Sequence, residues 1–293
     1  MLPYQTGILE EIPSQARYLT FSLKDKKHLM ATLKSVLDMV DGENVVMGIG
    51  RSLVTALDRD LPGLGTFPHY SGAGVDVPST PAALWFWLRG DDRGELLHRG
   101  RRIEHTLATS FNLNKPAEAF RYGTGLDLTG YEDGTENPKG DDAVDTAIVR
   151  GGGAGLDGSS FVAVQVWMHD LDRFEGMKAD EQDNTFGRHR SNNEEFDEAP
   201  ASAHVKRTAQ ESFEPEAFVL RRSMPWADKR QAGLVFVAFG KSFLAFETIL
   251  NRMTGNEDGI TDALFSFTRP VSGAYFWCPP MRQGRPDLSM LGV

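Results

Sequence analysis

One short stretch of the chain, GYEDGTENP at residues 130–138, combines the residues of a tight turn with several carboxylates. Gly130 and Gly134 permit backbone geometry that other residues avoid, and they leave space beside Asp133. An aspartate in such a place can cap its own turn, or it can serve as a base in a reaction. The turn residues by themselves leave both roles open.

A second feature is the pair Arg221 and Arg222 in FVLRRSMPW, within a predicted strand. Neighbouring residues of a strand point to opposite faces of the sheet, so one of the two should point inward. A buried arginine needs a carboxylate or an anionic ligand beside it. Asp133 is the obvious carboxylate to consider as its partner.

His204 stands out among the seven histidines because it lies in APASAHVKRT, among small residues that leave room for something bulky. A lone histidine is often structural, so the residue type alone does not assign it a role. No two histidines have the HExxH spacing, and a multi-histidine metal site is therefore not indicated.

Other ligand-binding motifs are incomplete. GGGAGLDGSS at 151–160 lacks the Lys-Ser/Thr of a P-loop, and GIG at 48–50 lacks the third Rossmann glycine. The acidic residues of 127–142 lack the spacing of an EF-hand loop. The single cysteine, Cys278, excludes intramolecular disulfides and multi-cysteine metal sites, and we expect it to pack as a small hydrophobe.

Composition limits the partners. With 41 acidic and 31 basic residues among 293, the net charge is near −10, which disfavours nucleic acid and anionic membranes. The N-terminal residues lack a basic segment followed by an apolar run, and no stretch approaches the roughly 18 apolar residues of a membrane span. We expect a globular cytoplasmic protein that makes no membrane contact.

The elements that must position these side chains fall into two similar halves. Hydrophobic periodicity in the first half predicts strand, helix, strand, helix, strand and helix over residues 16–23, 24–40, 43–50, 51–58, 82–90 and 92–108. In the second half it predicts strand, helix, strand, strand, helix and strand over residues 159–171, 171–177, 216–224, 233–240, 241–253 and 273–280. The segment VVMGIGRSLVTAL from 45 aligns with VFVAFGKSFLAFETIL from 235, as in an internal repeat.

Each half fits a split β-α-β unit on an antiparallel sheet, so the predicted fold class is α+β with two ferredoxin-like lobes. The predicted organisation is an N-terminal lobe over 1–125, an inter-lobe loop over 126–159, a C-terminal lobe over 160–280 and a flexible tail over 281–293. A loop as long as 126–159 inside a compact protein is usually functional.

The motifs resemble those of a known family. GYEDG matches the GxxDG motif of the dye-decolourising peroxidases, and GYEDGTENP resembles their bacterial B-type, or P-type, branch. Five further segments follow in the family's order and approximate spacing: FVAVQVWMHDL, FGRHRSNNEEFDE, PASAHVKRT, VLRRSMPWAD and FSFTRPVSGAYFWCPP. The resemblance covers most of the chain and implies a dimeric α+β barrel fold with a haem between the lobes.

The resemblance also implies roles for residues around that haem. His204 matches the proximal iron ligand, and Asp262 matches the acid that accepts a hydrogen bond from its imidazole. Asp133 and Arg221 match the distal carboxylate and the distal arginine. Ser223 occupies the position of a small polar distal residue, on the same predicted strand face as Arg221.

Three more residues would contact the cofactor. Arg188 resembles the arginine that pairs with a haem propionate, although His189 or Arg190 could take this part. Thr135 and Glu136 belong to the loop of the GxxDG motif and are expected beside the haem. In some relatives the position of Glu136 lies near the haem edge and helps to bind a metal ion.

By this resemblance the protein is a haem b peroxidase that uses hydrogen peroxide to oxidise dyes, phenols and other small aromatic reductants. The main alternative is a haem-handling protein, for porphyrin binding, transport or iron release, with incidental peroxidase activity. The third possibility is a structural module without haem, in which the acidic residues of the loop only cap turns. We expect a homo-oligomer. Some relatives dock by a C-terminal tail inside a protein nanocompartment, a signal that RQGRPDLSMLGV matches poorly.

Overall fold

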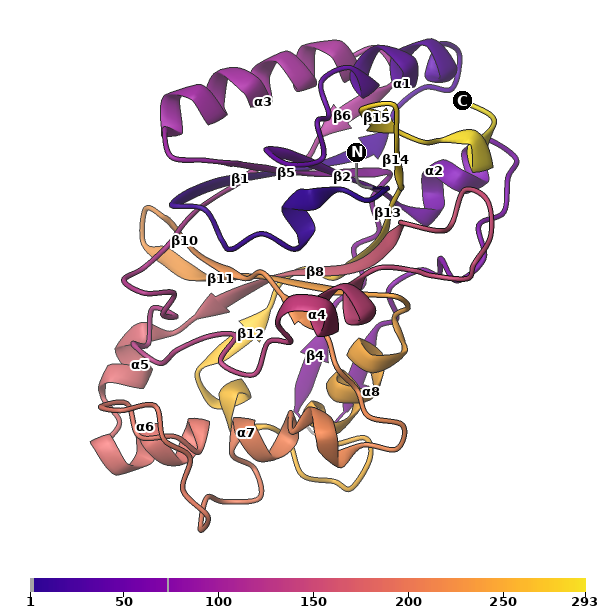
Figure 1. The fold of residues 1–293 in the computed structure, drawn as a ribbon. Coiled ribbons are helices and arrows are strands. Elements are labelled where there is room, and N and C mark those ends of the chain that lie inside the picture. Colours follow the sequence, from indigo (N-terminus) through magenta and orange to yellow (C-terminus); the bar gives the residue numbers. More distant parts are fainter. Residues whose placement is uncertain (1–2, 73) are drawn as a thin grey trace.

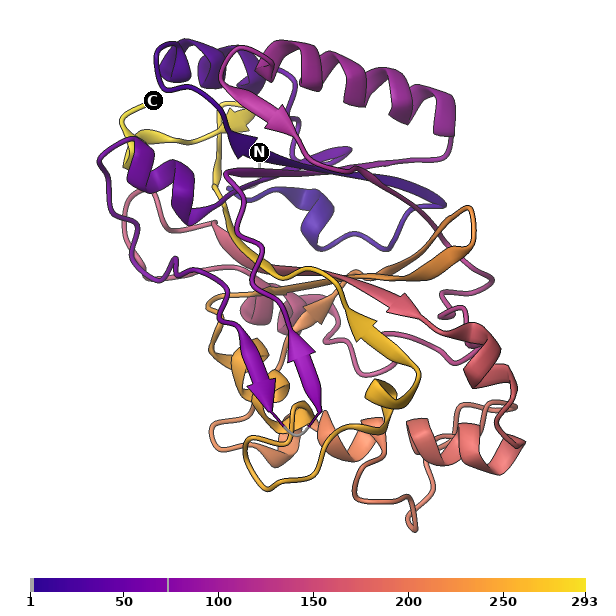
Figure 2. The same ribbon diagram turned by 180° about the vertical axis from the view of Figure 1, so that it is seen from behind.

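The computed structural model describes residues 3–72 and 74–293. Two antiparallel sheets face each other, and helices cover the outer side of each (Figures 1 and 2). Helices α1 (Leu29–Leu37) and α3 (Arg93–Leu107) cover the N-terminal sheet, whereas α7 (His204–Arg207) and α8 (Leu244–Met253) lie beyond the C-terminal sheet. None of the helices in these residues is both long and apolar enough to cross a membrane.

The N-terminal sheet consists of β1 (Gln15–Leu23), β2 (Val45–Ile49), β5 (Leu84–Gly90) and β7 (Ala117–Phe120) in the order β2-β5-β1-β7. The strands and helices predicted for this half are confirmed, except that the first helix begins only at Leu29. Strand β7 was not predicted, because its four residues have no clear alternation of polar and apolar side chains.

The C-terminal sheet has the order β13-β8-β11-β10, formed by β13 (Ala274–Cys278), β8 (Ser160–His169), β11 (Gln231–Gly240) and β10 (Met224–Asp228). The strand predicted over 216–224 is wrong in its extent, since pairing stops after the two residues of β9 (Leu220–Arg221). The chain resumes pairing in β10.

Two isolated pairings join the sheets into one ring. Trp277 of β13 pairs with Ile49 of β2, and Trp226 of β10 pairs with Ala119 of β7. The eight strands therefore close into an antiparallel barrel of the α+β type, with each sheet contributing four of them.

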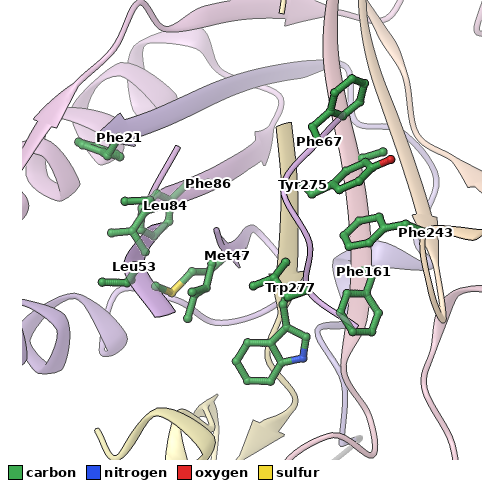
Figure 3. Close-up of a cluster of buried hydrophobic side chains, with 14 of the residues drawn as sticks. Phe21, Met47, Leu53, Phe67, Leu84, Phe86, Phe161, Phe243, Tyr275 and Trp277 are labelled. Carbon is green, nitrogen blue, oxygen red and sulfur yellow. The ribbon is translucent and has the colours of Figure 1, made fainter. Parts of the chain in front are cut away.

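Alternation along the strands sorts the core into two parts. Val162 and Val164 of β8 face the barrel interior with Tyr18, Trp85 and Trp87. The residues between them belong to a second cluster on the outer faces, part of which Figure 3 shows, with Phe161 and Tyr275 from the C-terminal sheet and Phe21 and Phe86 from the N-terminal sheet. Each sheet is therefore apolar on both faces, as expected for strands buried between layers. Cys278 is buried in the interior cluster, as expected.

The remaining elements are short. They are η1 (Thr6–Ile8), α2 (Arg51–Ala56), β3 (Tyr70–Gly72), β4 (Val75–Val77), β6 (Phe111–Leu113), α4 (Gly140–Ala147), α5 (Leu171–Glu175), α6 (Ala179–Phe186), η2 (Gln210–Ser212), η3 (Ala263–Ser266), β12 (Thr268–Pro270), β14 (Met281–Arg282), β15 (Arg285–Pro286) and η4 (Ser289–Leu291).

Four of them lie where the sequence predicted a loop or a flexible tail. The inter-lobe loop contains helix α4, whose apolar face buries Ala143 and Ala147. Residues 281–293, predicted as a flexible tail, instead form β14, β15 and η4 and bury Leu288 and Leu291. The apolar residues of this segment pack with the outer-face core rather than fraying.

Candidate active site

A cavity of about 710 Å³ lies between the outer face of the C-terminal sheet and the helices beyond it. Alternate residues of β8 and β11 form its sheet wall, and α7, α8 and the loop of the GxxDG motif close the other sides. Its apolar walls come from Trp167, Leu234, Phe236, Phe246, Ile249, Leu250, Met253, Leu264 and Phe267. A volume of this size suits a bound cofactor or a drug-sized molecule.

Asp133 and Arg221 meet at one wall of this cavity. Arg221 Nη1 lies 3.6 Å from Asp133 Oδ1, and about a fifth of each side chain is exposed. Asn137 fixes this arrangement, because its side-chain amide donates to the Arg221 carbonyl at 3.0 Å and accepts from the Arg221 N–H at 2.8 Å. The pairing that the sequence suggested between these two charges is therefore present.

The backbone conformation explains why a glycine follows Asp133. Gly134 has a φ of +78°, and a Cβ there would lie 2.6 Å from the Asn137 amide nitrogen. Only glycine adopts this backbone without strain and leaves room for the amide that holds Arg221. The turn residues and the charged pair of the motif thus depend on one another.

His204 enters the cavity from the helical side, as the first residue of α7. Its Nδ1 lies 2.8 Å from Oδ2 of Asp262, which is fully buried. The other oxygen of Asp262 accepts from the Leu264 N–H at 2.9 Å, so this carboxylate caps η3 and acts as an acceptor. His204 Nδ1 then carries the hydrogen, and Nε2 keeps a free electron pair, the form in which histidine binds a metal.

Arg188 lies at the rim of the cavity with its side chain only 12% exposed. Its Nη2 contacts Glu136 Oε1 at 2.9 Å and Glu195 Oε1 at 2.5 Å, and Nη1 donates to the Asn193 carbonyl at 2.9 Å. Thr135 lines the cavity close by and accepts a hydrogen bond from the Asn193 side chain. The structure thus brings Arg188, Thr135 and Glu136 together.

The two competitors of Arg188 lie elsewhere in the contact network. His189 Nδ1 is 3.1 Å from Asp183 Oδ2, and the backbone N–H of Arg190 donates to the same carboxylate. Neither residue is among the described residues that line the cavity. Arg188 is the arginine of the FGRHR segment that does line it.

Ser223 is not among the described cavity residues, although the sequence placed it on the face of Arg221. Strand β9 ends at Arg221, so the two-residue period does not continue to Ser223. Ser223 is instead buried, and its hydroxyl accepts from the Val237 N–H at 3.4 Å. The expectation that it faces the cavity is wrong for this reason.

Arg222 is the more buried arginine of the pair and points away from the cavity. Its guanidinium donates to the carbonyls of Leu9 and Arg221, at 2.7 Å and 3.1 Å, and burial lowers its pKa. The sequence predicted a carboxylate or an anion beside the buried arginine of the pair. Arg222, the more buried residue, has backbone carbonyls as its partners instead. The arginine that lies beside a carboxylate is Arg221.

Several polar residues of the cavity wall had no role predicted from the sequence. Asp127, Tyr131 and His169 are among them. Tyr131 donates to Asp183 Oδ1 at 2.5 Å and stacks on Phe186, which ties the motif loop to α6. Burial and the contact with Asp183 raise the pKa of Tyr131. One signal could have found His169, since Gln165 and His169 are polar residues on one face of an otherwise apolar strand.

The sequence matches known proteins over most of its length. The family model "Dyp-type peroxidase, C-terminal" matches residues 124–283. Dye-decolorizing peroxidase of Rhodococcus erythropolis is 30% identical over 249 residues, or 81% of this chain and 72% of that one. The relative from Brevibacterium linens is 29% identical over 82% of this chain and 67% of its own length. For the relative from Mycolicibacterium paratuberculosis the chain spans only 63% of its length, at 29% identity over 74% of this chain.

Solved structures match over nearly the whole chain. A dye-decolorizing protein from V. cholerae has a TM-score of 0.85 at 27% identity and covers 98% of both chains. A variant of Rhodococcus jostii DypB in complex with heme has a TM-score of 0.86 at 26% identity, over 93% of this chain and 94% of that one. The family match covers more than half of the chain, including the motif loop, His204 and Arg221. The chain belongs to the Dyp-type peroxidase family.

Proposed function

We propose that this protein is a haem b peroxidase that uses hydrogen peroxide to oxidise dyes, phenols and similar one-electron donors. The observation that carries the proposal is one cavity that receives the His204–Asp262 pair from the helical side and the Asp133–Arg221 pair from the motif loop and β9. Family membership supports peroxidase activity, and the DypB neighbour in complex with heme supports the cofactor.

The cavity residues fit a haem. His204 offers an unshared Nε2, the walls from β11 and α8 are apolar, and the buried guanidinium of Arg188 at the rim can receive a propionate. A propionate there would compete with Glu136 and Glu195 for the guanidinium. When bound, the haem supplies the redox chemistry with peroxide, and the protein orients it and sets its electrostatic surroundings.

The protein side of the proposed chemistry is proton and charge handling. The Asp133 carboxylate would accept a proton from hydrogen peroxide and return it to the departing oxygen. Arg221 would stabilise negative charge on the peroxide oxygens through Nη1, which already lies beside Asp133. Asp262 would hold the hydrogen of His204 Nδ1, which makes the imidazole a stronger electron donor. We assign Ser223 no role here, because it is not among the described cavity residues and its hydroxyl accepts from the Val237 N–H.

The organisation of the chain is part of the proposal. The strand orders β2-β5-β1-β7 and β13-β8-β11-β10 place the first and third strands of each half at the centre, which supports two ferredoxin-like lobes. We assign the lobes to residues 1–125 and 160–280, with 126–159 as the loop between them. The cofactor would lie in the C-terminal half rather than in the barrel interior, where aromatic side chains fill the space.

An absorption spectrum of the 293-residue protein, before and after addition of peroxide, tests the proposal. We expect an intense Soret band after haem reconstitution and steady-state oxidation of a phenolic dye that depends on peroxide. Absence of the band would overturn the proposal. Haem binding without turnover, together with release of free protoporphyrin, would favour a haem-handling protein instead.

A further inference from the structure

Two buried arginines, Arg89 and Arg222, have no part in the chemistry proposed above. Arg89 is 8% exposed and Arg222 is 7% exposed. Arg89 lies on the same face of β5 as Trp87, which packs in the barrel interior. Arg222 directly follows β9, and its N–H donates to the Val237 carbonyl of β11. Both side chains reach the N-terminal segment, which runs between the two sheets (Figure 1).

Backbone carbonyls accept hydrogen bonds from both guanidinium groups without neutralising their charge. Arg89 Nη2 donates to the Glu11 carbonyl at 2.6 Å, and Arg222 Nη2 donates to the Leu9 carbonyl at 2.7 Å. Each Nη1 atom donates to a further carbonyl. The two Nε–H groups are buried and have no acceptor among the described residues. Neither arginine forms an ion pair with a carboxylate in the part of the chain that the structure describes.

The two guanidinium groups lie close to each other. Their acceptors Leu9 and Glu11 are two residues apart, which is at most about 7 Å along the chain. Burial lowers the pKa of Arg222, and the positive charge of Arg89 adds to this effect. The carboxylates of Glu10 and Glu11 act in the opposite direction, but both residues are exposed and do not outweigh burial. Two like charges therefore face the protein interior with only partial compensation.

Tyr18 provides a third donor in the same region. Its hydroxyl is buried and has no hydrogen-bond partner among the described residues. In the pairing of β1 with β5, Tyr18 lies opposite Trp87 and Ala16 lies opposite Arg89, so Tyr18 and Arg89 are diagonal neighbours. Burial raises the pKa of Tyr18, and the charge of Arg89 opposes this shift. The hydroxyl therefore keeps its hydrogen and lies within the field of the guanidinium.

We propose that a compact anion such as chloride binds between Arg89 and Arg222 and accepts hydrogen bonds from their Nε–H groups and from Tyr18. A buried guanidinium requires a counter-charge, and a buried donor without an acceptor is costly. A water molecule could accept the same hydrogen bonds but would add no charge. The closely packed interior favours a monoatomic ion over a larger one. None of the three residues is among the described residues of the cofactor cavity, and the inference does not rest on the proposed function.

Thermal unfolding of the 293-residue protein without cofactor tests this site. Sodium chloride is compared with sodium gluconate at equal ionic strength, because gluconate is too large for the packed interior. We expect chloride to raise the unfolding midpoint saturably, by about 2–4 °C at about five times its dissociation constant. Equal midpoints in the two salts would overturn the inference and leave water as the acceptor.

Three variants locate the ion. Arg89→Met removes one guanidinium and should abolish the chloride-dependent shift. Tyr18→Phe removes one donor and should raise the dissociation constant for chloride about 10-fold. Arg101→Met, on the exposed surface of α3, is the control for loss of one positive charge and should respond to chloride as the parent does. A response that persisted unchanged in both Arg89→Met and Tyr18→Phe would place the ion elsewhere and contradict the inference.

Diffraction decides the question even if Arg89→Met does not fold. Crystals of the parent protein grown with sodium bromide should show an anomalous peak between the Nε atoms of Arg89 and Arg222. Absence of that peak would overturn the inference. A parent protein that binds no haem would contradict the proposed function, while the chloride and bromide results would still decide the present inference.

Discussion

The two sheets have the same kind of strand order, yet their outer faces are covered differently. Over the N-terminal sheet, α1 and α3 bury Leu33, Val36, Ile103 and Leu107 completely. Over the C-terminal sheet, α7 has four residues, and the outward side chains Leu234 and Phe236 of β11 remain partly exposed to the cavity. A repeated fold can thus provide a closed core in one half and a binding site in the other.

The covers are also held by different forces. Apolar contacts hold α1 and α3, whereas α7 is tied down by polar side chains. Arg207 of α7 contacts both oxygens of Asp258, at 2.8 Å and 2.7 Å, and His204 contacts Asp262. A helix of one turn has little stability of its own, so such contacts must set its orientation. The α7 cover of the C-terminal sheet therefore depends on charge, where the covers of the N-terminal sheet depend on packing.

The largest expected effect concerns the C-terminal half, in which we place the cofactor. His204→Ala removes the proposed iron ligand and should lower haem affinity by more than about 100-fold, beyond the usual effect of losing an orienting partner. The Soret band on haem titration measures this. His98→Ala, on the exposed surface of α3, is the control and should bind as the parent does. If both variants lost haem affinity equally, the effect would not be specific to the C-terminal half.

Asp133→Asn should slow the first reaction with peroxide by about 10²- to 10⁴-fold, because it removes the proposed base and leaves the volume unchanged. Stopped-flow absorbance across pH is the measurement. The haem affinity should stay near that of the parent. A rate equal to the parent's at every pH would show that Asp133 does not act as the base.

Arg221→Leu should slow the same reaction by about 10²- to 10³-fold through loss of charge stabilisation. Comparison with Asp133→Asn under identical conditions shows which residue contributes more. If Arg221→Leu proved the slower variant, the arginine would dominate peroxide activation. Parent-like rates in the arginine variant would remove it from the proposed chemistry.

Core substitutions should distinguish the halves in stability. Leu33→Ala in the closed core should lower the free energy of unfolding by about 2–5 kcal/mol and leave haem affinity unchanged. Leu234→Ala in the cavity wall should cost less stability, since its side chain is only partly buried, but it should weaken haem binding. Denaturant titration and haem titration are to be done on both variants. Equal losses of stability and of haem affinity in the two variants would contradict this prediction.

The smallest effect is a pH dependence of the polar cover. Hydrogen bonds from Arg207 and the Ile260 N–H lower the pKa of Asp258 to about 2. Because this pKa lies below the unfolded value of about 3.9, the contribution is present above that value and is lost as pH falls through about 2. Asp258→Asn should therefore reduce the acid sensitivity of unfolding followed by circular dichroism. An acid transition of Asp258→Asn equal to that of the parent protein would contradict this prediction.

The sequence predicted most strands and helices because their apolar residues recur with clear periods. The need of a buried charge for a partner predicted a carboxylate such as Asp133 beside Arg221 or Arg222, and the family resemblance assigned that place to Arg221. The sequence did not predict strand β7, whose four residues have only a weak pattern. Nor did it predict that residues 281–293 are ordered, because their few apolar side chains are fixed only by tertiary contacts with the core. The predicted orientation of Ser223 was wrong because the alternation of residue types does not show that the strand ends at Arg221.

The sequence by itself determined the internal repeat, the family motifs and the identity of the charged residues, because periodicity and side-chain chemistry are local properties. Only the tertiary structure decided which of Arg221 and Arg222 faces the cavity and that Asp262 orients His204. These contacts join segments distant in the chain, and their geometry depends on how the barrel closes. The roles of single polar residues therefore emerge only when the strands and loops are placed together.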